Sequence, residues 1–149
     1  LITSGIGLNR QRIARLKEAG LDHIQLSFQD STREVNDFLS STRTFDLKRE
    51  AAALIKEHGY SMVMNCVIHR LNIDHVDRII ELAVELEADY LELANTQFYS
   101  WAHINRDQLL PTADGRRRAA RVRIRAYRTR RAGHMDRGRG HDRNRRARH

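Results

Sequence analysis

The chain has 149 residues, about the length of one domain, and its 40% of hydrophobic residues is enough to form a core. No run of 18 apolar residues and no basic leader with a cleavage pattern is present, so we expect a cytoplasmic protein without a membrane-spanning helix or secretory signal. The single cysteine, Cys66, excludes a disulfide framework and a metal cluster held by cysteines of this chain alone.

The net charge of +8 is unevenly distributed along the chain. Residues 1–115 hold 12 Lys and Arg against 17 Asp and Glu, whereas residues 116–149 hold 15 Arg, no Lys and two acidic residues. We therefore predict a domain over residues 1–112 and an Arg-rich, disordered tail over residues 113–149. Natural basic arms usually mix Lys with Arg, so we interpret the tail as an out-of-frame translation of GC-rich codons. The alternative is a nucleic-acid-binding arm that neutralises phosphates.

The first segment alternates strands and helices. Hydrophobic periodicity and capping residues predict helices over residues 8–19, over 47–58 and from Asp74 onward, and strands over residues 23–30, 61–70 and 90–95, with 1–4 as the end of a further strand. Asn9 and Asp74 are expected to cap their helices. Residues 31–44 are predicted to be a polar loop and 96–112 a connecting segment. Strands separated by single helices imply parallel pairing.

The strands differ between their two faces. One face of residues 61–70 carries Met62, Met64, Cys66 and Ile68, and the other carries Val63, Asn65, Val67 and His69. Residues 23–30 likewise set Ile24, Leu26 and Phe28 against Gln25, Ser27 and Gln29. A sheet covered by helices on both sides would be apolar on both faces, so the pattern favours a barrel with a polar lumen and a ligand site at the carboxyl ends of its strands. The alternative is a one-sided sheet with a solvated face.

Several blocks of sequence stand in a characteristic order and spacing. They are Thr3-Ser4-Gly5-Ile6-Gly7-Leu8, Gln25-Leu26-Ser27-Phe28-Gln29-Asp30, Asn65-Cys66-Val67-Ile68-His69-Arg70 with Asn72, and Leu93-Ala94-Asn95-Thr96-Gln97-Phe98-Tyr99-Ser100-Trp101-Ala102, followed by Asn105-Arg106 and Pro111-Thr112. Over about residues 1–112 this set resembles the radical SAM enzymes of pyrroloquinoline quinone (PQQ) biosynthesis, the coenzyme PQQ synthesis protein E family.

The resemblance implies an α/β fold, namely the C-terminal half of a partial (β/α)6 radical SAM barrel. Enzymes of that family bind S-adenosylmethionine on a [4Fe–4S] cluster held by a C-x3-C-x2-C loop, which this chain lacks. They generate a 5′-deoxyadenosyl radical and crosslink Glu and Tyr of a precursor peptide, which a small peptide-binding chaperone presents. The chain is thus expected to be a fragment of such an enzyme, inactive alone, with nucleic-acid binding by the tail as the alternative function.

The resemblance also assigns site residues. Those expected to line the cofactor are Thr3, Ser4, Ser27, Gln29, Asn65 and His69. Those expected to line the peptide-binding mouth are Asn95, Gln97, Tyr99 and Trp101, although the same residues suit a plain cover for the open barrel edge. We predict no catalytic residue and no metal ligand, because His69 has no second ligand at a suitable spacing. A metabolic barrel fragment binding a phosphorylated ligand has only Gly5-x-Gly7 in its favour.

Overall fold

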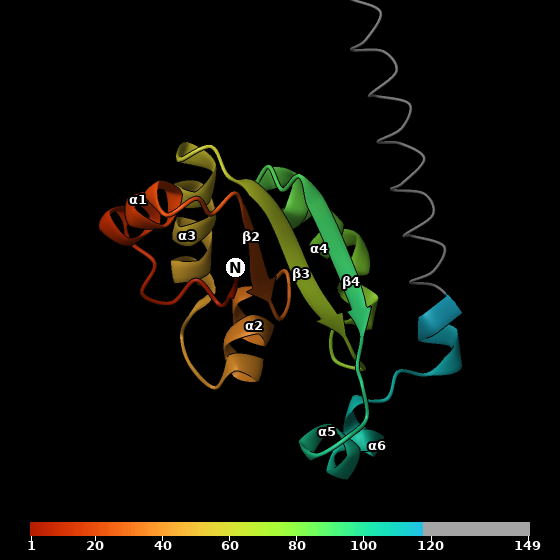
Figure 1. The fold of residues 1–149 in the computed structure, drawn as a ribbon. Coiled ribbons are helices and arrows are strands. Elements are labelled where there is room, and N and C mark those ends of the chain that lie inside the picture. The colour runs from red at the N-terminus through yellow and green to blue at the C-terminus, as the bar shows by residue number, and fades with distance from the viewer. Residues whose placement is uncertain (118–149) are drawn as a thin grey trace, which may run out of the picture.

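The computed structural model describes residues 1–117, in which four parallel strands alternate with helices (Figure 1). In chain order the elements are β1 (Ile2–Thr3), α1 (Arg10–Glu18), β2 (His23–Phe28), α2 (Arg33–Ser40), α3 (Phe45–Glu57), β3 (Ser61–Ile68), a 3-10 turn (Ile73–His75), α4 (Val76–Glu85), β4 (Tyr90–Asn95), α5 (Trp101–Ile104) and α6 (Arg106–Leu109). The strands follow one another across the sheet in the order β1-β2-β3-β4, and every pair is parallel. The predicted α/β architecture with parallel pairing is confirmed.

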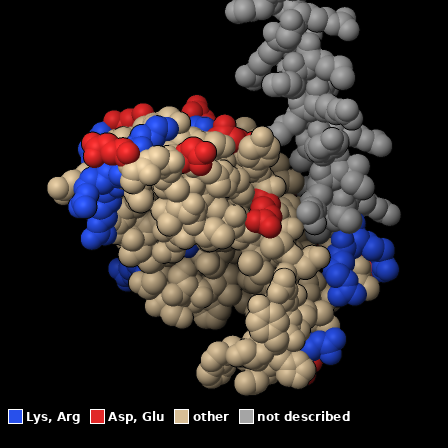
Figure 2. All heavy atoms as spheres, viewed as in Figure 1, with Lys and Arg blue, Asp and Glu red and all other residues tan. Residues whose placement is uncertain are grey.

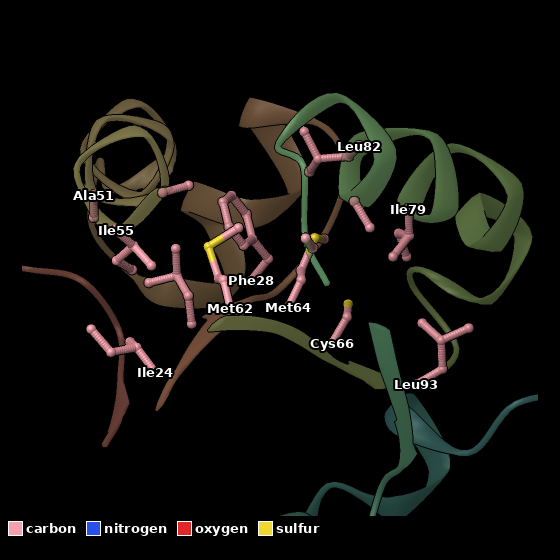
Figure 3. Close-up of a cluster of buried hydrophobic side chains, with 14 of the residues drawn as sticks. Ile24, Phe28, Ala51, Ile55, Met62, Met64, Cys66, Ile79, Leu82 and Leu93 are labelled. Carbon is pink, nitrogen blue, oxygen red and sulfur yellow. The ribbon is translucent and has the colours of Figure 1, made fainter. Parts of the chain in front are cut away.

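The core lies on one face of the sheet. Ile24, Leu26 and Phe28 of β2 point to the same side as Met62 and its alternate residues in β3, and all of them are buried. Figure 3 shows these side chains between the strands and the helices α3 and α4. Burying each large apolar side chain contributes about 1.5–3 kcal/mol, so this layer stabilises the fold substantially. The predicted apolar face is confirmed.

The start of α1 follows its sequence signal closely. The Asn9 side chain accepts a hydrogen bond from the backbone N–H of Arg12 at 2.9 Å, which satisfies one of the free donors of the first turn. Ile13, on the inner face of this helix, is fully buried. The predicted cap is therefore confirmed, and the helix begins at Arg10 rather than at Leu8.

The polar loop predicted over residues 31–44 is wrong, because it contains α2. Asn36 is unfavourable in a helix on propensity alone, but here it is buried and accepts a hydrogen bond from the backbone N–H of Gln29 at 3.1 Å. A left-handed Ser41 ends the helix. A tertiary contact therefore outweighs the local preference of this segment for a loop.

The spacing of apolar residues in the second helix predicts Leu47, Ala51, Leu54 and Ile55 on its inward face, and the structure differs at Leu47. The helix α3 begins at Phe45, two residues before the predicted start, and Leu47 is 47% exposed. Lys48 is buried in its place, one turn after Phe45, whose ring meets that of Phe28 edge-on at a centroid distance of 6.0 Å. A buried lysine is rare enough that the pattern favoured Leu47.

Further details of the elements differ from the prediction. Asp74 does not cap a helix: it lies within the 3-10 turn, and His75 stands at the N-cap of α4. The strands β2 and β3 end two residues early, because the backbone N–H groups of Gln29 and His69 donate to side chains instead of to a neighbouring strand. The predicted connecting segment contains the one-turn helices α5 and α6.

Residues 113–117 are helical, and Gly115 packs against Ile73. The domain boundary at residue 112 stays a prediction. The disorder and the out-of-frame origin predicted for the tail also stay predictions, because residues 118–149 lie outside the described part of the chain. Among residues 1–117, no helix is long and apolar enough to span a bilayer.

Candidate functional site

The second face of the sheet is open and carries a row of polar residues. Ser27 of β2 lies in register with Asn65 of β3, which lies in register with Glu92 of β4. The Asn65 side-chain amide donates a hydrogen bond to a Glu92 carboxylate oxygen at 2.7 Å, which leaves the amide oxygen of Asn65 available as an acceptor. The Ser27 hydroxyl has no hydrogen-bond partner within residues 1–117. This row presents both donors and acceptors to a ligand.

The carboxyl ends of β2 and β3 are joined by one buried side chain. Asn72 donates to the carbonyl oxygens of Gln29 at 2.8 Å and Val67 at 2.9 Å, and it accepts from the backbone N–H of His69 at 2.9 Å. These three hydrogen bonds use both N–H donors of the Asn72 amide and one of the two lone pairs of its oxygen. Asn72 therefore fixes the spacing of the two strand ends that carry the predicted cofactor residues.

His69 is buried just beyond β3. Its Nδ1 accepts a hydrogen bond from the backbone N–H of Leu71 at 3.2 Å, so in this arrangement the ring hydrogen resides on Nε2. Burial lowers the pKa of His69, which keeps the ring neutral at physiological pH, and the Asp30 carboxylate opposes this shift. His69 is therefore suited to donate a hydrogen bond rather than to supply a positive charge.

Behind β2, on the side of the helices, lies a second polar group that the sequence did not indicate. The fully buried Asp30 carboxylate accepts from the Thr32 backbone N–H and hydroxyl and from the His75 ring. Lys48 reaches the end of β2 from α3 and donates to the Ser27 carbonyl oxygen at 2.8 Å and to the Gln29 side chain. Asp30 and Lys48 thus contact the end of β2 from the helix side of the sheet.

The structure does not bring Thr3 to the open face. Thr3 lies in register with Leu26, whose side chain points into the core, and its hydroxyl accepts from the backbone N–H of Gly5 at 3.0 Å. Ser4 follows it at the exposed end of β1. Of the six predicted cofactor residues, Ser27 and Asn65 share one row and Gln29 and His69 flank it at the strand ends.

The residues predicted for the peptide-binding mouth follow the carboxyl end of β4. Asn95 pairs with Ile68 at the last register position, and Gln97 comes after the strand. Tyr99 and Trp101 are 69% and 76% exposed, which leaves two large aromatic surfaces open to solvent. Figure 2 shows the surface hollowed between the main body and the projecting segment that contains α5 and α6. Two exposed aromatic side chains close together in sequence suit an interaction surface.

The one cysteine lies on the wrong face for a metal centre. Cys66 is fully buried among core side chains, in agreement with its place on the apolar face predicted for residues 61–70. Burial raises the pKa of its thiol to about 12, whereas iron and zinc are bound by the thiolate. Within residues 1–117, no three His, Cys, Asp or Glu side chains are grouped so that they could hold a metal ion.

A parallel sheet with helices on one face and a polar row on the other defines a segment of an α/β barrel, with its ligand side at the carboxyl ends of the strands. The particular family follows from comparison: residues 1–83 match the model of the Radical SAM superfamily, and the chain belongs to that superfamily. The predicted partial radical SAM barrel is thereby confirmed.

Solved structures of an anaerobic sulfatase-maturating enzyme, anSMEcpe, have a similar fold. The enzyme with bound AdoMet and the Cp18Cys peptide is 21% identical with a TM-score of 0.56, over 64% of this chain and 27% of that chain. The enzyme with bound AdoMet alone is 20% identical with a TM-score of 0.58, over 67% of this chain and 29% of that chain. The chain thus spans less than a third of these enzymes, and the likeness concerns the fold.

Enzymes of this superfamily use S-adenosylmethionine and a [4Fe–4S] cluster. The residues of this chain do not fit the cluster, because its one thiol is enclosed in the core and held protonated. They do fit S-adenosylmethionine in part. The open row offers an unpartnered hydroxyl and an amide oxygen, and ribose hydroxyls and an amino-acid head group bind to such groups.

Sequence reasoning missed Glu92, whose carboxylate accepts a hydrogen bond from Asn65, a predicted cofactor residue. A signal was present: Tyr90, Glu92 and Ala94 alternate with Leu91 and Leu93, which places Glu92 on the open face. Lys48 and Asn72 were missed for another reason, namely that each contacts β2 from a distant part of the sequence: Ser27 lies 21 residues from Lys48, and Gln29 lies 43 residues from Asn72.

Proposed function

We propose that the open face of this sheet forms part of the S-adenosylmethionine site of a peptide-modifying radical SAM enzyme. The observation that supports it most is the row formed by Ser27, Asn65 and Glu92 across three neighbouring strands. When bound to an intact enzyme of this superfamily, S-adenosylmethionine supplies a 5′-deoxyadenosyl radical. This chain supplies binding and orientation for it, and no ligand for the cluster.

Each residue of the row has a distinct task in this proposal. Glu92 orients the amide of Asn65 so that its oxygen accepts from a ribose hydroxyl or an ammonium group. The Ser27 hydroxyl donates to or accepts from the neighbouring polar atom of the ligand. His69, held neutral by burial, donates from Nε2 at the mouth of the site. Asn72 keeps the ends of β2 and β3 at the separation that these contacts need.

The substrate part of the proposal rests on the sequence resemblance. The resemblance to the PQQ family favours crosslinking of Glu and Tyr in a precursor peptide, with a small chaperone as partner. Asn95, Gln97, Tyr99 and Trp101 would then contact the peptide beyond the carboxyl end of β4. Binding of a peptide by anSMEcpe is compatible with such a substrate class. Non-specific binding of polyanions by the Arg-rich tail remains a separate proposal that rests on composition alone.

The proposal is tested by titrating the full 149-residue chain with S-adenosylmethionine and following backbone and side-chain amides by NMR. Because this ligand carries a net positive charge, the Arg-rich tail does not attract it. We expect shifts at Ser27, Asn65 and Glu92. Asn65→Ala is expected to weaken binding by about 1–2 kcal/mol, since it leaves Glu92 and a ligand group without their partner.

The matched control is Gln11→Ala, which removes an exposed amide from α1, away from the row. It is expected to leave the affinity unchanged. Equal affinities for the wild-type chain and Asn65→Ala, or shifts confined to residues outside the row, would contradict the proposed site.

A further inference from the structure

Lys48 is a buried lysine without a carboxylate partner. It is 1% exposed, and within residues 1–117 its ammonium group hydrogen-bonds only to the Ser27 carbonyl oxygen and the Gln29 side chain. The ring of Phe28 lies 5.7 Å from its Nζ. Burial lowers the pKa of Lys48, which expresses the cost of enclosing a cation. A hydrophobic residue at this position would avoid the free-energy cost of burying a charge. The contacts that Lys48 makes at the end of β2 therefore explain why a lysine is present here.

The lysine decides which way the Gln29 amide points. The ammonium group of a lysine has three N–H donors and no acceptor, so it can only donate to the atoms that it reaches. The atom of Gln29 that faces Lys48 must therefore be the amide oxygen. The Ser40 hydroxyl approaches the same oxygen at 3.4 Å. The amide nitrogen of Gln29 is consequently turned away from both.

The main chain of Gln29 is fixed as well. Its N–H donates to the Asn36 side chain and its carbonyl accepts from Asn72 at 2.8 Å. The Gln29 amide nitrogen has no hydrogen-bond partner among residues 1–117. In this part of the chain the Ser31 hydroxyl is the only fully buried side-chain polar atom without a partner, so the Gln29 nitrogen is accessible to solvent. Gln29 is thus held at every group except its two side-chain N–H donors.

We propose that Lys48 is a positioning residue that makes Gln29 a hydrogen-bond donor only, so that the end of β2 takes an acceptor oxygen of the bound molecule. Such an oxygen belongs to a hydroxyl, carbonyl or carboxylate group. For the choice of ligand, the inference rests on the proposed function, with S-adenosylmethionine as the probe. The lysine does not touch the ligand and acts through the glutamine alone.

The orientation is tested without ligand, by NMR of the Gln29 side-chain NH₂ group in the full chain. In the wild-type chain we expect a resonance pair that exchanges rapidly with water. Lys48→Met removes the constraint and keeps the length of the side chain, so that the amide can turn its nitrogen toward Ser40. Both resonances should then shift and exchange should slow. Unchanged resonances in a folded Lys48→Met chain overturn the positioning role.

The polarity is tested by Gln29→Glu, which keeps the shape and turns the outward atom into an acceptor. The variant gains a charge-assisted contact to Lys48, so its free energy of unfolding should equal or exceed that of the wild-type chain. Its S-adenosylmethionine dissociation constant should rise about tenfold, because two acceptors then face each other. A merely structural role of Gln29 would leave binding intact, which separates the two explanations and does not depend on the folding of Lys48→Met.

Gln25→Glu is the matched control, because Gln25 lies on the same face of β2, away from Lys48. It makes the same change of charge and should leave the dissociation constant within about twofold of the wild-type value. If the wild-type chain binds S-adenosylmethionine and Gln29→Glu binds it equally well or more tightly, the inference that Gln29 acts only as a donor is overturned. The proposed function is then unaffected. Absence of binding by the wild-type chain contradicts the proposed function and the choice of ligand, while the Gln29 resonances still decide the role of Lys48.

Discussion

Asp30 and His75 meet behind β2, although they are 45 residues apart in sequence. The His75 Nδ1 lies 2.9 Å from one carboxylate oxygen of Asp30 and 3.0 Å from the other, and the carboxylate is fully buried. Thr32 donates to the same carboxylate from its hydroxyl at 2.6 Å and its backbone N–H at 2.9 Å. The pair therefore ties the loop after β2 to the start of α4.

We predict that His75→Ala lowers the free energy of unfolding by about 1–3 kcal/mol, because it leaves a buried carboxylate with one donor group fewer. His75→Gln, which retains a donor, should lose less. Urea denaturation measures both. His103→Ala is the control, since His103 lies exposed in the short helix α5. Equal stability of His75→Ala and the wild-type chain would show that the contact contributes nothing.

Asn72 is predicted to matter through the direction of its hydrogen bonds. Its amide nitrogen donates to two carbonyl oxygens, of Gln29 and Val67. Asn72→Asp keeps the size and replaces that nitrogen with an oxygen, which then faces two acceptors. We expect it to destabilise the chain at least as much as Asn72→Ala, for which about 1–3 kcal/mol is expected. A milder effect of Asn72→Asp than of Asn72→Ala in thermal unfolding would contradict this bonding pattern.

The faces of β2 and β3 could be predicted because strict alternation reflects a property of the strand itself. The core residues Ile24 and Met64 and the open-face residues Ser27 and Asn65 lie where the alternation placed them. The cap at Asn9 is equally local. In each case the residues that determine the structure are neighbours in sequence.

The remaining site could not be predicted in this way because its partners are distant. A lysine in an amphipathic helix is expected to face solvent. Lys48 is buried because its ammonium group donates to the carbonyl oxygen of Ser27, 21 residues earlier in the sequence. Asn36 turns a predicted loop into a helix by a contact outside that helix. The contact between Asn65 and Glu92 depends on the register of β3 and β4, which no local pattern fixes.

The Cys66 thiol gives a prediction about pH. Burial, reinforced by the Asp30 carboxylate and opposed by Lys48, raises its pKa from 9.0 to about 12. Between these values the folded chain retains a proton that the unfolded chain releases, so stability falls as the pH rises. The slope is about 1.4 kcal/mol per pH unit from this group. Cys66→Ala removes it, and urea denaturation at about pH 8 and about pH 10.5 should show a smaller loss for the variant. Equal losses for the two chains would mean that the thiol does not carry the effect.

The same thiol predicts the outcome of iron–sulfur reconstitution. A [4Fe–4S] cluster requires several thiolates, and the only cysteine of this chain is enclosed in its core. After anaerobic treatment with iron and sulfide we expect no cluster absorbance, and no 5′-deoxyadenosine after addition of dithionite and S-adenosylmethionine. Cys66→Ala should behave identically. Stoichiometric iron in the wild-type chain, lost in Cys66→Ala, would contradict the burial of this residue.

Gly5 and Gly20 offer a matched test of the turn that follows β1. Both have a positive φ, +82° at Gly5 and +85° at Gly20, so a side chain at either is strained. A Cβ on Gly5 would lie 2.9 Å from the Ala51 Cβ and 2.9 Å from a methyl carbon of Leu26, whereas a Cβ on Gly20 meets nothing within 4 Å. Gly20→Ala should therefore cost about 1 kcal/mol from backbone strain alone. Gly5→Ala should cost about 1–3 kcal/mol more, because the added methyl group overpacks the contact between the turn, α3 and β2. Equal losses for the two variants in urea denaturation would mean that the turn does not pack against α3.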